Sequence, residues 1–404
     1  MKYNVWNKWG KLRTVMLGRC YHPEFFRDIK ETRIRDALTR ITEETIEDLE
    51  NYEKVLKDFG CEVIIPKLDA KESIMEHIDD HGKLRSIPRS PLQPRDGQLV
   101  IGNNLYYSCL HGTSEHPAIK EALDSYDESN IILMPDPIKH HPIFSKSWFD
   151  KIKGADWLTY DDYLADDYYS KVPPFVKQEI QDFKQSFYFS APSMTVVGKD
   201  IYVDMEQLIR EEHASKVLNN MAKYLSDYLP FMRVNILKHG GHSDSCFHTL
   251  KPGAILSLED IQPYQETFPG WDVCYLPDQS WILMEDFLRF KGKVQGKWWV
   301  PGEEDNDGFV EFVETWLQDW VGYCEESVFD VNVLMLDDKH VCVNNYNELS
   351  FEFFKKHKIE PIIVPWRHRY FWDGGLHCIT LDLKRDGELE DYFPNRKKSI
   401  NQFS

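Results

Sequence analysis

A strand–helix–strand unit recurs about five times along the chain, and this repetition limits the possible folds more than any other feature. The first copy combines an apolar run at 12–18, helically spaced apolar residues over 42–59 and a second apolar run at 61–66. Gly60 is expected to end the helix between the two strands. The first unit is therefore predicted to be strand, helix, strand.

The later copies begin with two strands joined by a short polar or glycine turn. In the second unit a strand pair at 97–108 is followed by a strand at 131–135. The other three units each comprise a strand or strand pair, a helix and a closing strand, in that order: 195–205, 214–228 and 233–238; 253–258, 261–268 and 271–277; and 332–344, 349–357 and 359–365. Five such modules in a ring would form a closed α/β propeller with one central site, and we expect residues 1–404 to form a single domain. The alternative, a doubly wound sheet, normally carries a glycine-rich nucleotide loop, and neither G-x-G-x-x-G nor G-x-x-x-x-G-K-[ST] occurs in the sequence.

Two segments fit no module. Residues 67–95 contain Pro88, Pro91 and Pro94, which exclude a regular helix through the second half. Residues 291–323 include a second helically spaced stretch and form an insertion within the domain. The first is a candidate lid loop and the second a candidate surface helix or partner contact, and both could equally be packing elaborations.

Composition excludes several classes of function. The net charge of −19 opposes nonspecific binding to nucleic acid or to an anionic membrane, and would modestly favour cationic small molecules. No apolar run approaches the roughly 18 residues of a membrane-spanning helix, and the first residues do not resemble a secretory signal. We therefore expect a cytoplasmic protein. Its eight cysteines include no C-x-x-C pair, which argues against a zinc ribbon or a thioredoxin-like site, so we expect most of them to be free thiols.

Three short stretches combine residue types that could carry chemistry. Cys378 follows two glycines and a histidine and precedes a predicted strand, which would fix the direction of the thiol. His242 and Asp244 would point to the same face of an extended segment and could combine proton transfer with a carboxylate that holds a cation. Asp96 lies where a loop enters a strand, and its carboxylate could accept two hydrogen bonds from a guanidinium. Each pattern alone is more often structural.

Together these stretches resemble the amidinotransferase branch of the guanidine-modifying (pentein) superfamily, as in arginine:glycine amidinotransferase. Five motifs occur in the family's order, namely PRD before a strand and Gly-Asn, GKDIYV at 198–203, H-x-D followed by PG-x-x-LS, NVLMLD at 332–337, and GG-x-HC-x-T-x-D. The resemblance covers 190–392 best, apart from the insertion. It implies the five-module pentein propeller, which the repeats indicate independently, and a homodimer.

The resemblance also implies roles for individual residues. Cys378 matches the nucleophile and His242 the general acid/base, while Asp96 and Asp244 match the carboxylates that hold the guanidinium. The implied reaction is ping-pong transfer of an amidino group from an arginine-like donor to an amine, without metal or cofactor. Arg367 matches a basic position before the nucleophile loop and is a candidate for an anion contact.

Some positions depart from the family pattern. The aspartate that supports the catalytic histidine is replaced by Ser190, which can hydrogen-bond an imidazole but cannot stabilise its cation by charge. Two pocket serines fall near Glu325 and Glu326, and this acidity could favour a diamine acceptor over glycine. The alternatives are a deiminase or dihydrolase that uses water as acceptor, and a non-catalytic guanidine-binding protein.

Overall fold

The computed structural model describes most of the 404-residue chain. The described ranges are 2–77, 87–107, 116–133, 191–204, 229–237, 242–258, 264–277, 298–318, 320–322 and 326–400. The expected helix at 214–228 and the candidate residue Ser190 lie outside these ranges.

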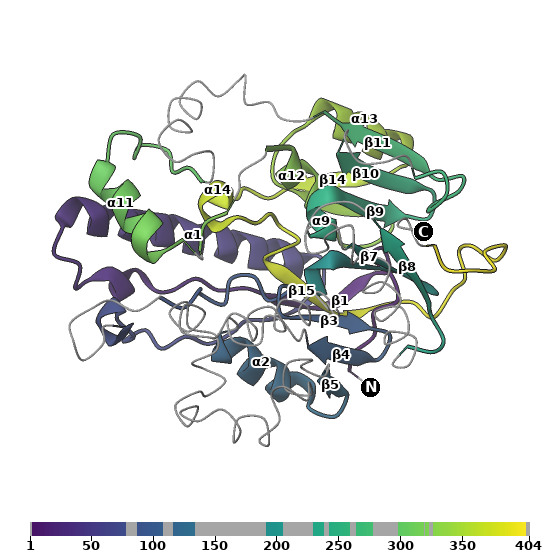
Figure 1. Ribbon diagram of the computed structural model, residues 1–404, viewed down its shortest axis with the longest axis horizontal. Coiled ribbons are helices and arrows are strands. Elements are labelled where there is room, and N and C mark those ends of the chain that lie inside the picture. Colours follow the sequence, from purple (N-terminus) through teal and green to yellow (C-terminus); the bar gives the residue numbers. More distant parts are fainter. Residues whose placement is uncertain are drawn as a thin grey trace, which may run out of the picture.

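The described strands form five three-stranded sheets with one shared topology (Figure 1). In each sheet the first strand is antiparallel to the second, and the second is parallel to the third. Four sheets are consecutive in sequence: β3 (Gln98–Ile101), β4 (Asn104–Tyr107) and β5 (Ile131–Leu133); β6 (Met194–Val197), β7 (Asp200–Asp204) and β8 (Arg233–Leu237); β9 (Phe247–Lys251), β10 (Ala254–Leu258) and β11 (Asp272–Leu276); β12 (Leu334–Met335), β13 (His340–Val343) and β14 (Glu360–Ile363). The repeats in the sequence therefore correspond to the sheets.

The fifth sheet joins the two ends of the described chain. Its first strand is β15 (Thr380–Arg385), which pairs with β1 (Leu12–Leu17), and β1 pairs in turn with β2 (Glu62–Ile64). Leu17 lies opposite Thr380, so the start of the first module is held by the last strand. The predicted fold class, a five-module α/β propeller, is confirmed.

The loops that precede the first strands converge at the centre of the ring. β3 contacts β15, and the short helix α9 (Ser243–Cys246) contacts β6, the 3-10 helix η5 (Ala191–Ser193) and α12 (Glu326–Val331). Equivalent positions in different modules thereby come together, although they are far apart in the sequence.

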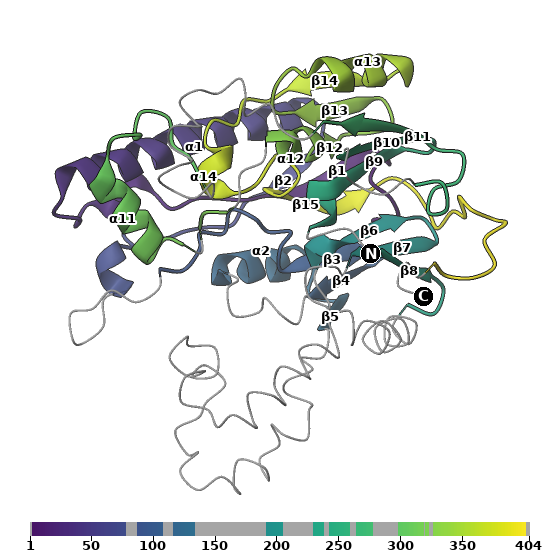
Figure 2. The ribbon, with the colours of Figure 1, turned by 45° about the horizontal axis from the view of Figure 1, so that its top comes forward.

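Helices cover the outside of the ring. They include α2 (Pro117–Asp127), α13 (Glu348–Lys356) and the short 3-10 helices η1 (Pro23–Phe26) and η2 (Ile74–His77), while the short helix α14 (Arg369–Trp372) is buried against α1. The longest is α1 (Thr32–Asp58), which lies beside α11 (Asp307–Trp316) in both ribbon views (Figures 1 and 2). The inserted segment supplies α11, and its side chains Trp298, Phe309 and Val313 are buried in the same core as α1. This burial favours the packing interpretation of the insertion.

Three local expectations differ from the structure. The first helix begins at Thr32 rather than at residue 42, because Ile34, Leu38 and Ile41 extend its buried stripe. The described part of the expected helix at 261–268 consists of turns. The segment after His242 is a helical turn rather than an extended strand. No helix among the described residues is long and apolar enough to cross a membrane.

Candidate active site

Cys378 lies in the turn between α14 and β15, and its side chain is buried. The amide Nδ2 of Asn332 donates a hydrogen bond to its Sγ over 2.9 Å, and the thiol donates to Oδ2 of Asp244 over 3.6 Å. Gly375 lies in the same loop, and only glycine fits there because a Cβ at this position would lie 2.7 Å from Oδ1 of Asn332. The thiol is thus held between an amide donor and a carboxylate.

Asn332 also fixes the backbone around Cys378. Its Oδ1 accepts hydrogen bonds from the backbone amides of His377 (2.9 Å) and Cys378 (3.1 Å), while Nδ2 also donates to the carbonyl of Asp244 (3.2 Å). The residue is fully buried and lies two positions before β12. It was not among the site residues expected from the sequence, although it opens the NVLMLD motif.

Asp244 and His377 form a buried pair beside the thiol. Nδ1 of His377 donates to Oδ2 of Asp244 over 2.6 Å. Burial, with the positive charges of Arg95 and Lys8, lowers the pKa of His377 to about 3 despite this partner. Burial would raise the pKa of Asp244, but the hydrogen bond and charge of His377, with His242 and Lys8, hold it below its ordinary value. The pair is therefore a carboxylate with a neutral imidazole at neutral pH.

The electrostatic surroundings of the thiol favour its neutral form. Burial, followed by the negative charges of Asp244 and Asp96, raises the pKa of Cys378 well above its ordinary value. The hydrogen bond from Asn332 acts in the opposite direction. A cation placed between the two carboxylates would cancel the charge that disfavours the thiolate.

His242 and Asp96 face the same region from two other loops. His242 precedes the first turn of α9, and its charge lowers the pKa of Asp244 and opposes the rise in the pKa of Asp373. Asp96 is half-buried and pairs with Arg89 over 3.5 Å. The loop that carries Asp96 is tied to the loop that carries Cys378, since Nε of Arg95 donates to the carbonyls of His377 and Thr380, both over 3.0 Å. The second half of the candidate lid is thus a wall of this site.

The remaining predicted residues are not brought to the thiol by any described contact. Arg367 pairs with Asp48 over 2.9 Å and with Glu47 over 2.8 Å, both on α1. Ser190 and Glu325 lie outside the described residues, as does the side chain of Glu326. Within the described ranges, no three His, Cys, Asp or Glu side chains are grouped as a metal site would require.

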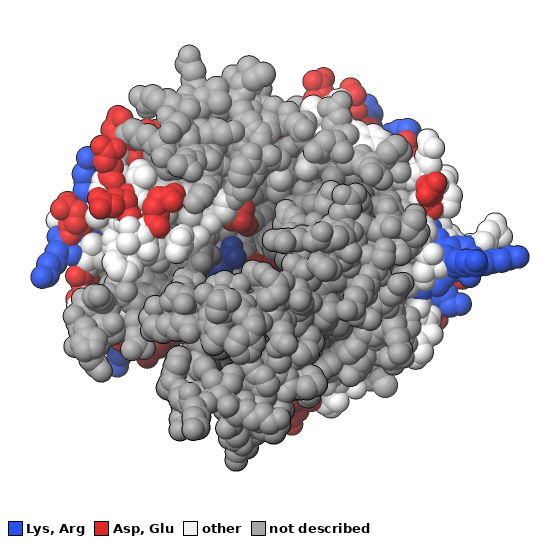
Figure 3. Space-filling model, viewed as in Figure 1, with Lys and Arg blue, Asp and Glu red and all other residues white. Residues whose placement is uncertain are grey.

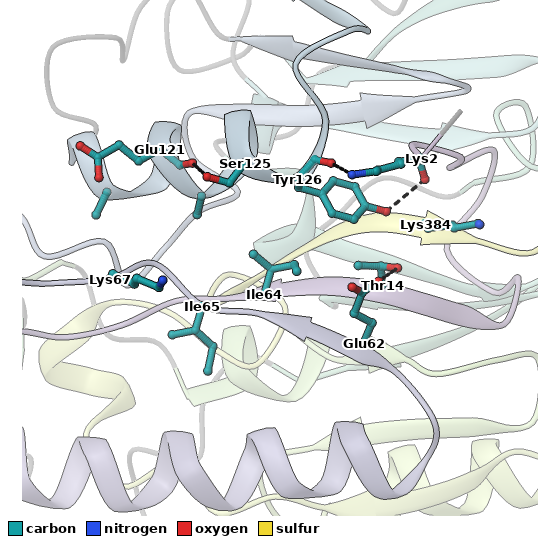
Figure 4. A pocket seen from close by; sticks show the side chains of 12 residues that line it. Lys2, Thr14, Glu62, Ile64, Ile65, Lys67, Glu121, Ser125, Tyr126 and Lys384 are labelled. Atoms are coloured by element: carbon teal, nitrogen blue, oxygen red, sulfur yellow. Dashed lines mark hydrogen bonds between the residues drawn. The ribbon is translucent and has the colours of Figure 1, made fainter.

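Two cavities can be compared with the position of Cys378, and one of these two is lined by residues that surround it. The larger, about 660 Å³, lies between α2 and the edge formed by β1 and β2 (Figure 4). It is lined by residues such as Lys2, Glu62 and Glu121, and none of the residues around Cys378 contributes to it. The smaller, about 30 Å³, is lined by Lys8, Arg95, Ser243, Asp244, His377 and Asp382, among others. Figure 3 shows a hollow near the middle of one face, in which acidic and basic side chains lie close together.

A ring of five three-stranded sheets, with a thiol and carboxylates converging at its centre, defines a pentein-type α/β propeller. Solved structures have the same fold. An amidinotransferase of Microseira wollei from the saxitoxin biosynthetic pathway matches 97% of this chain and 100% of its own, with a TM-score of 0.60 and 18% identity. An inosamine-phosphate amidinotransferase from Streptomyces griseus matches 96% of this chain and 99% of its own, with a TM-score of 0.57 and 18% identity.

Among proteins of this fold, the relatives found by sequence comparison are amidinotransferases. No family model matches the chain. It is 26% identical over 209 residues to an L-arginine:L-lysine amidinotransferase of Pseudomonas savastanoi pv. phaseolicola, covering 50% of this chain but only 46% of that one. It is 24% identical over 432 residues to the mitochondrial glycine amidinotransferase of Gallus gallus, covering 96% of this chain and 84% of that one. The chain is therefore homologous to amidinotransferases and has the pentein fold.

Proposed function

We propose that the chain moves an amidino group from arginine, or a similar guanidine, to an amine through a covalent amidino-cysteine at Cys378. The observation that carries this proposal is the thiol's position 3.6 Å from Oδ2 of Asp244, where the charge of Asp96 also acts on it. A guanidinium is a planar cation with donors on every edge, so it can bind both carboxylates at once. Its arrival cancels their charge and favours the thiolate next to the carbon to be attacked.

The first half of the reaction follows from this arrangement. The thiol proton passes to His242, and the sulfur of Cys378 attacks the central guanidinium carbon to form a C–S bond. The C–N bond to the alkyl chain then breaks, and His242 returns the proton to the departing amine. Arginine would leave as ornithine, with the amidino group held on sulfur.

The second half reverses these steps with a new amine. The acceptor nitrogen attacks the amidino carbon, gives a proton to His242, and the C–S bond breaks to restore the thiol. Glycine or a diamine can serve as acceptor in this scheme. The acidity at Glu325 and Glu326 favours a cationic acceptor such as a diamine.

Product analysis by mass spectrometry tests the proposal. The purified protein is incubated with L-arginine, alone and with glycine, lysine or diamines. Ornithine formed together with a new guanidino compound is the expected result, and the mass of that compound identifies the acceptor. Citrulline formed whether or not an amine is added would instead establish hydrolysis, and the absence of any product would contradict both reactions with arginine.

Variants connect the activity to the site. Cys378→Ser and His242→Ala are expected to abolish turnover, because they remove the nucleophile and the proton carrier. Cys274→Ser is the matched control, since Cys274 lies on β11 outside the site. Unchanged turnover in Cys378→Ser would exclude the covalent mechanism.

A further inference from the structure

A buried lysine lies beneath the candidate site. Lys8 precedes β1, and only 7% of its surface is exposed. Its Nζ has one hydrogen-bond acceptor among the described residues, Oγ1 of Thr195, at the long distance of 3.4 Å. Thr195 is in turn hydrogen-bonded over 2.9 Å to the hydroxyl of Ser243, the neighbour of Asp244. An ammonium with so few partners is unusual in a protein interior.

The 30 Å³ cavity shows where this ammonium lies relative to the thiol. Lys8, Asp244 and His377 all line the cavity, whereas Cys378 does not. Oδ1 of Asp244 and Nε2 of His377 are buried and have no hydrogen-bond partner among the described residues. The space is large enough for one water molecule with polar neighbours. Asp244 therefore has the thiol at one side and Lys8 across the cavity on the other.

We propose that Lys8 is a positioning residue that balances the charge of Asp244 in the free protein and gives up its proton when a guanidinium binds the same carboxylate. The inference rests on the proposed function, because it requires that Asp244 holds the guanidinium. If Lys8 kept its proton, the bound guanidinium and the ammonium would place two positive charges around one buried carboxylate. Loss of the Lys8 proton to solvent removes that repulsion.

Burial makes the Lys8 proton easy to lose, while the charges around the ammonium act in both directions. Asp244 and Asp382 stabilise the ammonium, while Arg95 and Arg385 oppose it. In the described part of the chain, the imidazoles of His377 and His248 also face the ammonium of Lys8. Burial, the dominant cause, lowers the pKa of Lys8 to about 8, so the residue is mostly protonated at pH 7 yet close to release.

Calorimetry can count the proton. L-arginine is titrated into the Cys378→Ser protein at pH 7 in two buffers of different ionisation enthalpy, so that binding is measured without turnover. We expect release approaching one proton per site, and an arginine affinity that rises up to about tenfold per pH unit below pH 8 and levels off above it. The same titration of Lys8→Met/Cys378→Ser should show release reduced by about that proton and a flat affinity over this range.

A matched control and the contrary outcomes complete the test. Lys11→Met/Cys378→Ser changes a lysine of the same segment that lies over the ring of Phe59, and should keep the proton release. Equal release with and without Lys8 would assign the proton to another group, such as His242, and overturn the inference. The inference would also be overturned if the Cys378→Ser protein, in which Lys8 is intact, bound arginine without releasing a proton. Failure of arginine to bind would overturn this inference and the proposed function with arginine as donor, whereas the other outcomes leave the function intact.

Discussion

The side chain of Asn332 makes four hydrogen bonds around the nucleophile, one to Sγ of Cys378, two from backbone amides of the nucleophile loop and one to the carbonyl of Asp244. Donation to sulfur stabilises the thiolate more than the thiol. Asn332→Ala should therefore raise the pKa of Cys378 further and lower kcat about 10- to 100-fold, as expected for loss of a hydrogen bond to a charged group. The rate of thiol alkylation, measured against pH, should have its midpoint at higher pH than in the wild type.

A buried asparagine outside the site provides the control for this change. Asn344 donates to the carbonyl of Phe329, and in the described part of the chain no hydrogen bond joins it to Cys378. Asn344→Ala should reduce stability without moving the alkylation midpoint. If both variants lost activity only in proportion to their stability, Asn332 would be a structural residue alone.

Residue types and short motifs indicated Cys378, His242, Asp244 and Asp96 from the sequence, and the structure places all four around one region. The motifs did not indicate Lys8, because a lone lysine before a strand has no pattern that distinguishes it from a surface charge. His377 was visible as part of the HC pair, but its hydrogen bond to Asp244 joins two loops that are 133 positions apart. Such a pairing depends on the fold and not on local spacing.

At the scale of elements, the nucleophile loop depends on close packing at its glycines. A Cβ at Gly375 would lie within 2.7–2.9 Å of three atoms of the Asn332 side chain, which is itself fixed by hydrogen bonds. Gly375→Ala should displace Asn332 and lower kcat by at least about tenfold, consistent with the loss of one hydrogen bond to the thiolate. Gly308→Ala, in the first turn of α11 where the nearest atom is 3.8 Å away, should leave activity unchanged. Comparison of kcat with the thermal midpoint of each variant separates the two effects.

The insertion offers an element whose role is expected to be stability. Oδ1 of Asn306 accepts a hydrogen bond from the amide of Phe309 over 3.1 Å and caps α11, whose Phe309 and Val313 are buried against the α1 core. Asn306→Ala should cost about 1 kcal/mol of unfolding free energy. Thermal denaturation should show a lower midpoint, with kcat unchanged in the folded protein. A fall in kcat with an unchanged midpoint would instead connect the insertion to catalysis.

The pattern of apolar residues located most elements and failed where tertiary packing decides the boundary. The stretch at 42–59 is helical as predicted, yet α1 begins ten residues earlier because α11 and Trp298 cover its first turns. Spacing alone placed His242 and Asp244 on one face of an extended segment. In the structure the chain turns immediately after His242, so Asp244 reaches His377 from the first turn of α9.

At the scale of the whole molecule, the ring explains why the site draws on distant segments. Asp96, Asp244, Asn332 and Cys378 each lie two or three positions before the first strand of a sheet, that is, before β3, β9, β12 and β15. The repeats therefore predicted a central site before any motif was assigned. The closing pair β15 and β1 was not evident, since the first module appeared complete as strand, helix and strand, and only the ring requires the last strand there.

The centre of the ring also makes the molecule sensitive to acid. His248 is fully buried, and neither of its nitrogens has a hydrogen-bond partner among the residues that the structure describes. Burial, with the charges of Lys8 and His377, lowers its pKa well below the ordinary value. Burial likewise lowers the pKa of His377 to about 3. A histidine with a lowered folded pKa binds a proton more readily when unfolded, so its neutral form contributes full stability above about pH 6.5 and loses it as pH falls.

Each such histidine should reduce the unfolding free energy by about 1.4 kcal/mol per pH unit between about pH 6 and pH 4. Asp244 and Asp382 extend the loss to lower pH, because a carboxyl with a lowered pKa stabilises the fold above its unfolded pKa and stops doing so as it is protonated. His248→Phe replaces the imidazole with an aromatic ring that cannot be protonated. In urea denaturation from pH 7 to pH 4, the unfolding free energy of this variant should therefore fall less steeply with pH, by the contribution of one proton. His22→Gln, at an exposed position, should leave the slope as it is. An unchanged slope in His248→Phe would mean that His248 is protonated equally in the folded and unfolded chain. The centre of the ring would then admit a proton, although the burial of His248 and its cationic neighbours are expected to exclude one.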